Sequence, residues 1–190
     1  MLRVTLIVSA MLLAVLPAKA DGTILKIITR QDSERLAGYE TTRKQALEEA
    51  RRGSAQDVAI LDGIIARPDL PFGSFGMTGD WKCRTLKLGG NLPLVVYGWF
   101  KCRVTDDGSG WQLEKLTGSQ RTKGRFYTDG DNRLTYLGSG YIAGEATLPY
   151  GSGAETDEVG YAYRTSDDAF RIEFPAPAKE SRFNILELAR

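Results

Sequence analysis

The stretch from Gly79 to Val104 limits most strongly what this chain can fold into. It reads GDWKCRTLKLGGNLPLVVYGWFKCRV, two apolar-rich segments on either side of a turn centred on Asn91 and Pro93. Each segment carries one of the only two cysteines in the sequence, Cys83 and Cys102. Two such segments joined by a turn rich in glycine and asparagine predict an antiparallel β-hairpin.

The first 20 residues have the pattern of a signal peptide. Arg3 precedes an apolar run from Val4 to Leu16, and the small-x-small sequence AKA at 18–20 suits signal peptidase. A membrane anchor would need roughly 20 apolar residues, and this run is shorter. We therefore expect cleavage after Ala20, a secreted mature chain in the periplasm, and no membrane span after cleavage.

The charge of the mature chain is close to balanced. Loss of Arg3 and Lys19 lowers the 25 basic residues to 23, against 24 acidic ones, so the net charge becomes −1. Domains that bind nucleic acid are usually strongly basic. We therefore expect no nucleic-acid partner, and a partner that is instead an envelope protein or a small ligand of unknown identity.

The two cysteines are expected to form a disulfide bond. If Gly90 and Val95 close the turn, Cys83 lies directly opposite Cys102 in the hairpin. A pair of cysteines in an exported protein is usually bonded. The alternative is a redox or metal-binding pair, but the sequence has neither the CxxC spacing nor any histidine.

Four basic side chains share the other face of the predicted hairpin. In this register Lys82 opposes Arg103, and Arg84 opposes Lys101. Like charges directly opposite each other destabilise a sheet, so this face is a candidate binding patch for an anionic ligand. The alternative is a solvated outer surface on which water and salt screen the charges.

The chain after the hairpin continues as short apolar runs separated by turn-forming residues. In the first strand Leu86 and Leu88 have the opposite parity from Trp81, so we expect a bulge between them. The predicted strands span residues 81–88, 95–104, 111–117, 123–128, 134–137 running on towards 143, 159–164, 169–174 and 183–189.

Eight short strands with short connections favour an antiparallel up-and-down barrel, because closure removes exposed edges. A two-sheet β-sandwich is the alternative. In a closed barrel the first and last strands are neighbours, which places Arg190 near the indole of Trp81.

We expect a helical arm and linker at 21–78 and a barrel domain at 79–190. The glycine-rich loop 144–158 is expected to be either a lid or a flexible connection.

The arm has the periodicity of a helical hairpin. Residues 32–52 predict one helix that begins with Asp32 as N-cap and ends before Gly53, and Ser54 opens a second helix that Pro68 stops. We expect these helices to pack against the barrel or cover one end of it; the alternative is an arm that binds a partner protein. Residues 67–79 are expected to form a linker loop.

The absence of histidine from the sequence removes the usual Ser-His-Asp and Cys-His nucleophilic systems. No phosphate-binding loop of the Walker type and no dinucleotide fingerprint occurs. Acidic pairs such as Asp157 with Glu158 exist, but turns collect aspartate for local hydrogen bonding. The sequence therefore predicts no catalytic residues, no metal site and no cofactor.

The hairpin sequence, the segment KLTGSQRTKGRFYTDGDNRLTYLGSGY and the ending RFNILELAR resemble DUF4893, an uncharacterised family of small exported alphaproteobacterial proteins. This resemblance covers most of the mature chain and implies an envelope location, but no activity. The GxW sequence at 79–81 is also similar to the start of lipocalin-like barrels, which implies ligand or protein binding. The long helical arm departs from that second pattern.

These observations support three hypotheses about function. The first is a non-catalytic periplasmic module that binds a ligand or a protein, and the alternative is a cell-envelope hydrolase that works through carboxylates. The third is a structural envelope protein. A cavity inside the barrel favours binding, convergent buried carboxylates favour catalysis, and a filled barrel with a broad apolar outer patch favours protein contact.

Overall fold

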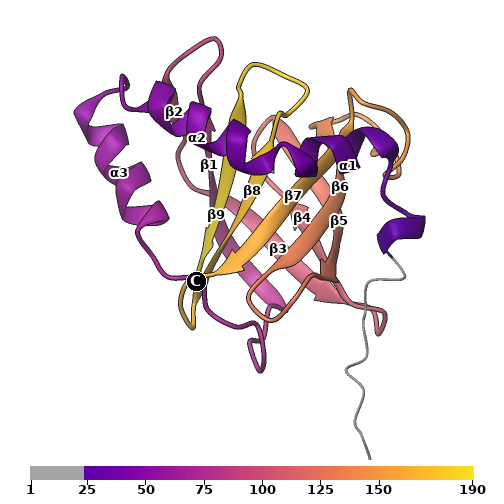
Figure 1. Cartoon of the computed structure of the whole chain (residues 1–190). Coiled ribbons are helices and arrows are strands. Elements are labelled where there is room, and N and C mark those ends of the chain that lie inside the picture. Colours follow the sequence, from indigo (N-terminus) through magenta and orange to yellow (C-terminus); the bar gives the residue numbers. More distant parts are fainter. Residues whose placement is uncertain (1–23) are drawn as a thin grey trace, which may run out of the picture.

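The computed structural model describes residues 24–190, which form a β-barrel with three α-helices against its outer wall (Figure 1). The predicted signal peptide lies outside the described residues. None of the described helices is both long and apolar enough to cross a membrane.

The strands of the described chain form one antiparallel sheet in the order β2-β1-β3-β4-β5-β6-β7-β8-β9. β1 and β9 also pair, which closes eight strands into the predicted barrel and excludes the sandwich; β2 is an additional short strand. The strands are β1 (Gly79–Leu88), β2 (Leu94–Val96), β3 (Phe100–Asp106), β4 (Trp111–Lys115), β5 (Gln120–Thr128), β6 (Leu134–Ile142), β7 (Asp157–Arg164), β8 (Ala169–Pro175) and β9 (Phe183–Ala189).

The disulfide between Cys83 and Cys102 is confirmed, but the predicted register of its hairpin is wrong by two residues. Trp81 lies opposite Cys102, and Cys83 lies opposite Phe100, so the bond joins diagonal neighbours with a Cα–Cα distance of 5.9 Å. Side chains alternate between faces with a period of two. A shift of two residues therefore leaves both cysteines on the inner face, within bonding reach.

The bulge expected in the first strand is absent. β1 pairs with β9 without interruption from Lys82 to Leu88. The hairpin is instead interrupted in its second segment, at residues 97–99 between β2 and β3. Leu86 and Leu88 consequently face outwards, where helices bury them, and Lys87 between them faces the barrel interior.

The arm contains three α-helices where two were predicted: α1 (Arg30–Ala37), α2 (Tyr39–Ala50) and α3 (Ala55–Ile65), after a short 3₁₀ turn at Ile24–Lys26. The predicted single helix at 32–52 breaks at Gly38, a residue with low helix propensity. Thr29, not Asp32, is the N-cap of α1, since its hydroxyl accepts from the amide of Asp32. Ser54 caps α3 as predicted.

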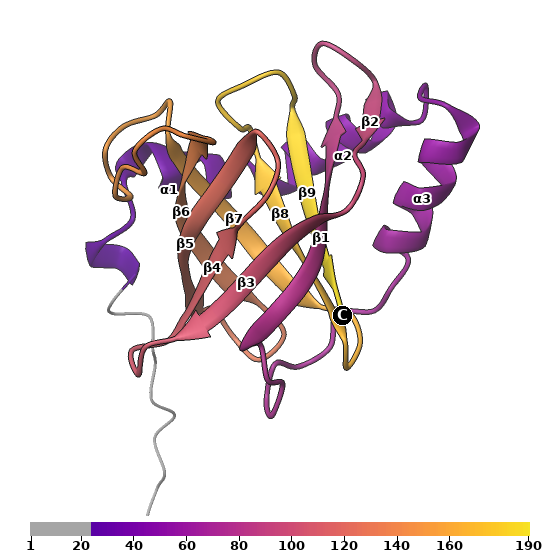
Figure 2. The ribbon, with the colours of Figure 1, turned by 180° about the vertical axis from the view of Figure 1, so that it is seen from behind.

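The helices lie across the outer wall near the end of the barrel where β1 stops and β9 starts (Figures 1 and 2). Their apolar side chains bury outward-facing residues of β1, β2 and β9 and so form a core outside the barrel. Its buried members are Tyr39, Ala46, Ala50, Leu61, Ile64, Leu86, Leu88, Leu94, Phe183 and Ile185.

A second core fills the opposite end of the barrel interior. Trp81 and Phe170 pack edge to face there, with ring centroids 4.9 Å apart. The predicted linker contributes Phe72, Phe75 and Met77, which are buried and plug this end. The guanidinium of Arg190 lies 4.0 Å from the Trp81 ring centroid, which confirms the predicted cation–π contact. The inner core leaves only the other end of the barrel open.

Candidate functional site

A cavity of about 180 Å³ lies inside the open end of the barrel, where β1 stops and β5 and β9 begin. We call it the mouth cavity. Both apolar and charged side chains line it. The lining includes Phe100, Phe174 and Leu186, and the charged or polar Arg35, Lys87, Lys115, Gln120, Arg121, Thr122, Glu158 and Glu180.

Strand alternation positions the charged side chains of the mouth cavity. On β4 Lys115 shares its face with Leu113, which is part of the inner core. On β7 Glu158 shares its face with Ala162, which is also in that core. Residues two apart on a strand point to the same face. Because Leu113 and Ala162 face the inner core, Lys115 and Glu158 also point into the barrel, closer to its open end.

Lys115 is a buried lysine, 6% exposed. Its Nζ lies 4.3 Å from the centroid of the Phe100 ring, and no carboxylate within residues 24–190 is in ion-pair distance of it. Burial lowers the pKa of Lys115 to about 8, although the charge of Glu158 acts in the opposite direction. A buried cation that faces a cavity and has no ion-pair partner is typical of a binding or catalytic site.

Glu158 is the second unusual group in the mouth cavity. Its Oε2 is shielded from solvent and has no hydrogen-bond partner in the described part of the chain. Burial raises the pKa of Glu158, while the Thr122 hydroxyl and the charges of Arg35 and Lys115 oppose that rise. Gly140 on β6 leaves room for the carboxylate, since a Cβ there would lie 2.8 Å from Oε1.

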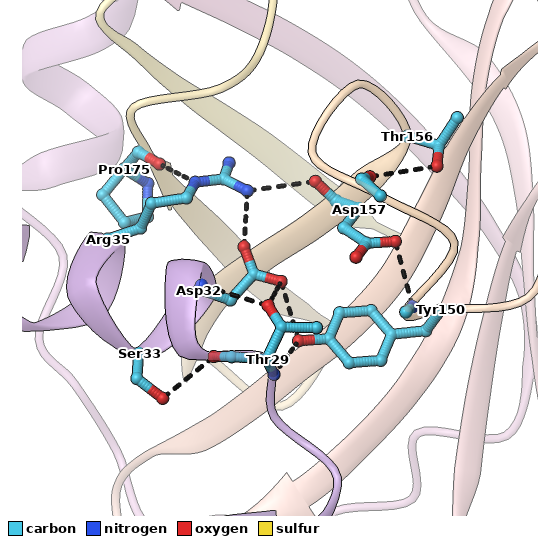
Figure 3. A network of polar contacts seen from close by, with 10 residues as sticks. Thr29, Asp32, Ser33, Arg35, Tyr150, Thr156, Asp157 and Pro175 are labelled. Atoms are coloured by element: carbon cyan, nitrogen blue, oxygen red, sulfur yellow. Dashed lines mark hydrogen bonds and ion pairs between the residues drawn. The ribbon is translucent and has the colours of Figure 1, made fainter.

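Arg35 extends from α1 to the cavity, and its guanidinium lies between Pro175 and Asp157 (Figure 3). β7 and β8 pair only as far as Tyr161 opposite Glu173, so their ends at the open end of the barrel separate. The guanidinium spans this gap, donating from Nε to the carbonyl oxygen of Pro175 at 3.2 Å and from Nη1 to that of Asp157 at 3.0 Å. Its buried Nη2 has no partner among the described residues.

The loop between β6 and β7 is fastened to α1 beside this gap (Figure 3). The Tyr150 hydroxyl donates to Asp32 Oδ2 at 2.7 Å, and Asp32 Oδ1 accepts from Arg35 at 2.8 Å. The amide of Gly151 donates to Asp157 Oδ1 at 3.0 Å. These bonds hold the loop, α1 and the end of β7 in one polar network beside the mouth cavity.

Lys87 and Glu180 form the rim of the cavity. Lys87 makes an ion pair with Glu180, in the loop between β8 and β9, and donates to Gln120 Oε1 at 2.9 Å. The hydrogen bond from Lys87 lowers the pKa of Glu180. Glu180 has a φ of 66°, in the left-handed region that is uncommon for residues other than glycine. The ion pair therefore holds a backbone turn over the cavity entrance.

The predicted anion patch lies on the outer face of β1 and β3, away from the mouth cavity. The predicted cross-strand pairs are wrong, because the register differs by two residues: Lys82 opposes Lys101. Arg84 instead donates to Glu187 at 2.6 Å, and Arg103 donates to an exposed aspartate, Asp80, also at 2.6 Å. Two of the four basic residues thus have carboxylate partners, and Lys82 and Lys101 remain side by side on the surface.

Sequence reasoning missed Lys87 and Lys115 and recognised Glu158 only as part of an acidic pair. A signal was present, since Lys115 is two residues from the apolar Leu113 and Lys87 is two residues from Thr85. Charged residues are usually expected on the solvent face of a strand. In this barrel the two lysines lie on the inner face instead, because the inner face at the open end lines a cavity and is not part of the apolar core.

A model of one protein family, described as a domain of unknown function (DUF4893), matches residues 25–188. No curated protein and no solved structure matches the chain. The family match spans both the helices and the barrel, including every residue of the mouth cavity named above.

Proposed function

The chain belongs to the DUF4893 family, whose description assigns no function, and from the mouth cavity we propose that it is a non-catalytic module that binds a small organic anion. The single observation that carries this proposal is Lys115, a buried cation that faces the cavity without an ion-pair partner in the described chain. Burying an unpaired charge is costly. A bound anion would supply the missing partner.

The balance of charges around the cavity supports an anionic ligand. Four cationic side chains, Arg35, Lys87, Lys115 and Arg121, line it, against the two carboxylates of Glu158 and Glu180. Glu180 is already paired with Lys87, and Arg35 with Asp32, so the surplus lies with Lys115 and Arg121 against Glu158. The surplus of positive charge lies in a partly enclosed cavity, where screening by solvent is weaker than at the surface.

The size of the cavity restricts the ligand. Its volume of about 180 Å³ is below the roughly 300–1,000 Å³ of pockets that hold drug-sized molecules. It corresponds to about six water molecules at roughly 30 Å³ each. The ligand is therefore a small acid whose carbon skeleton rests on Phe100, Phe174 and Leu186.

We also propose that the protein acts after export to the periplasm, as the pattern of its first 20 residues favours. A small-ligand barrel of this kind would be consistent with the similarity of its first strand to lipocalin-like barrels. N-terminal sequencing of the protein from its own host tests the export proposal. The expected first residue is Asp21, and recovery of chains that keep residues 1–20 would contradict it.

A carboxylate-dependent hydrolase is the second candidate, and one observation favours it. Glu158 and Glu180 line the same cavity, and their pKa values shift in opposite directions, by burial for Glu158 and by Lys87 for Glu180. Such a divergence is typical of an acid and base pair. This candidate ranks second because the ion pair with Lys87 already occupies Glu180.

Native mass spectrometry of the protein from its own periplasm tests the binding proposal. We expect a retained small acid in the unaltered protein and its loss in the Lys115→Met variant. The matched control is Lys101→Met, on the outer face, which should keep the ligand. Retention by Lys115→Met with loss in Lys101→Met would contradict the proposal and move the site to the predicted patch of Lys82, Arg84, Lys101 and Arg103.

A further inference from the structure

The mouth cavity contains unsatisfied groups of both signs. Glu158 Oε2 is a buried acceptor without a donor, and Arg35 Nη2 is a buried donor without an acceptor, both judged within residues 24–190. Lys115 adds a cation that has no ion-pair partner in the described chain. Buried polar groups are almost always hydrogen-bonded in native proteins. A cavity that has both an unpaired acceptor and an unpaired donor therefore indicates a ligand that carries both a donor and an acceptor.

The charges of these groups act on one another, but no hydrogen bond or ion pair in the described chain joins them. Arg35 is already committed to Asp32 and to the carbonyl oxygens of Pro175 and Asp157, which fix the guanidinium in the wall gap. None of the ion pairs of Arg35 or of Lys115 in the described chain includes Glu158, although all three residues line the same cavity. The space between them is therefore a site for a group that touches both the cations and the carboxylate.

We infer that the ligand of the mouth cavity is a small zwitterion, an acid that also carries a protonated amine. Its carboxylate would accept from Lys115 and Arg35, and its ammonium would donate to Glu158. A plain acid would leave Glu158 Oε2 without a donor, and a plain amine would leave Lys115 without an ion-pair partner and Arg35 Nη2 without an acceptor. This inference rests on the proposed function, since it names the class of anion.

The test compares matched pairs of ligands that differ only in the amine. Isothermal titration calorimetry on the mature chain measures succinate against aspartate, and glutarate against glutamate, at about pH 7. In at least one pair we expect the amine-bearing member to bind about tenfold more tightly, the effect of one charge-assisted hydrogen bond. Glu158→Gln should remove this preference while the affinity for the plain acid stays within about twofold or rises.

Two further variants show that the effect belongs to this site. Glu158→Asp, which keeps the charge, should retain part of the preference for the amine. Lys115→Met should weaken both members of a pair by a similar factor, because it removes the partner of the shared carboxylate. Each variant must first show a cooperative thermal melt, so that loss of binding is separated from loss of fold.

The outcomes separate the inference from the proposed function. Equal binding of both members in both pairs, with loss in Lys115→Met, would overturn the zwitterion and leave the anion-binding module intact. A preference for the amine that survives Glu158→Gln would also overturn it. If no member of either pair binds, the zwitterion inference and the anion-binding proposal both fail.

Discussion

Two glutamates with carboxylate oxygens shielded from solvent show that the same side chain can stabilise the barrel or cost it stability. Glu173 on β8 faces outwards under α2 and accepts from Tyr39 at 2.5 Å, from Arg43 at 2.7 Å and from Arg171 at 2.6 Å. Burial opposes its ionisation, but Arg171 and Arg43 outweigh burial and hold the pKa of Glu173 below its ordinary value. Glu158, on the inner face, is partly exposed, and its shielded Oε2 has no such partner among the described residues.

The first prediction contrasts Glu173→Gln with Glu158→Gln. Loss of the Glu173 charge removes a partner from the buried Arg171 and from the partly exposed Arg43, so the free energy of unfolding at about pH 7 should fall by about 3 kcal/mol. Because the folded pKa is lowered, this contribution is present above the ordinary pKa of 4.5 and is lost as the pH falls through the folded value. Urea unfolding at about pH 7 and about pH 3 measures both effects.

Glu158→Gln should change stability in the opposite direction. Its folded pKa is raised, so the ionised group costs stability once the pH exceeds that raised value, and the glutamine removes this cost. The variant should therefore melt at a higher temperature than the unaltered protein at about pH 7. A lower melting temperature would show that Glu158 is paired within the fold and is not held for a ligand. Binding sites often sacrifice stability in this way.

The second prediction concerns the pH dependence of ligand affinity. Because burial places the pKa of Lys115 at about 8, the side chain loses its positive charge as the pH rises through that value. Affinity for a plain acid such as glutarate should be constant below about pH 7 and fall between about pH 8 and pH 9. In Lys115→Arg, whose guanidinium stays protonated, any remaining binding should show no such fall. An unchanged pH profile in that variant would exclude Lys115 as the anion's partner.

At the scale of single elements, the sequence predicted which residues of a strand share a face, because side chains alternate between the two faces. The inward orientation of Cys83 and Cys102 survived an error of two residues in register, because such an error preserves the face. The helix break occurs at Gly38, whose low helix propensity the periodicity of apolar residues does not register. The interruption at residues 97–99 likewise has no counterpart in that periodicity. Lys87 was missed because the expected bulge would have moved it to the other face, whereas uninterrupted pairing of β1 keeps it on the face of Cys83.

The third prediction concerns the hairpin disulfide. The bond joins residues separated by 19 positions, and in the chain-entropy model a loop of that size contributes about 3 kcal/mol to stability. Reduction should lower the denaturant midpoint accordingly, and the double variant Cys83→Ala with Cys102→Ala should match the reduced protein. If peptide mapping of fresh protein found both thiols free, or if reduction left the midpoint unchanged, the bond would not stabilise the hairpin.

At the scale of the whole molecule, two cores lie on opposite sides of one sheet. β9 belongs to both, because Leu186 and Leu188 face the inner core and Phe183 and Ile185 face the helices. It also pairs with β8 along its whole length and with β1 from Phe183 to Ala189. Removal of β9 would therefore open the barrel and take apolar side chains from both cores.

The fourth prediction follows from that arrangement. Deletion of residues 183–190 exposes the edges of β1 and β8 and removes apolar side chains from both cores, so the chain should lose its cooperative unfolding transition altogether. The control is Arg190→Ala, which keeps β9 and removes only the contact with Trp81 and the hydrogen bonds to the carbonyl oxygens of Gly76 and Thr78. It should cost about 0.5–1 kcal/mol for the cation–π contact, plus about 1 kcal/mol for those bonds. Circular dichroism melts compare the two proteins directly. A truncated chain that still melts cooperatively near the temperature of the unaltered protein would mean that strands β1 to β8 form a stable open sheet. It would also mean that closure by β9 does not hold the mouth cavity together.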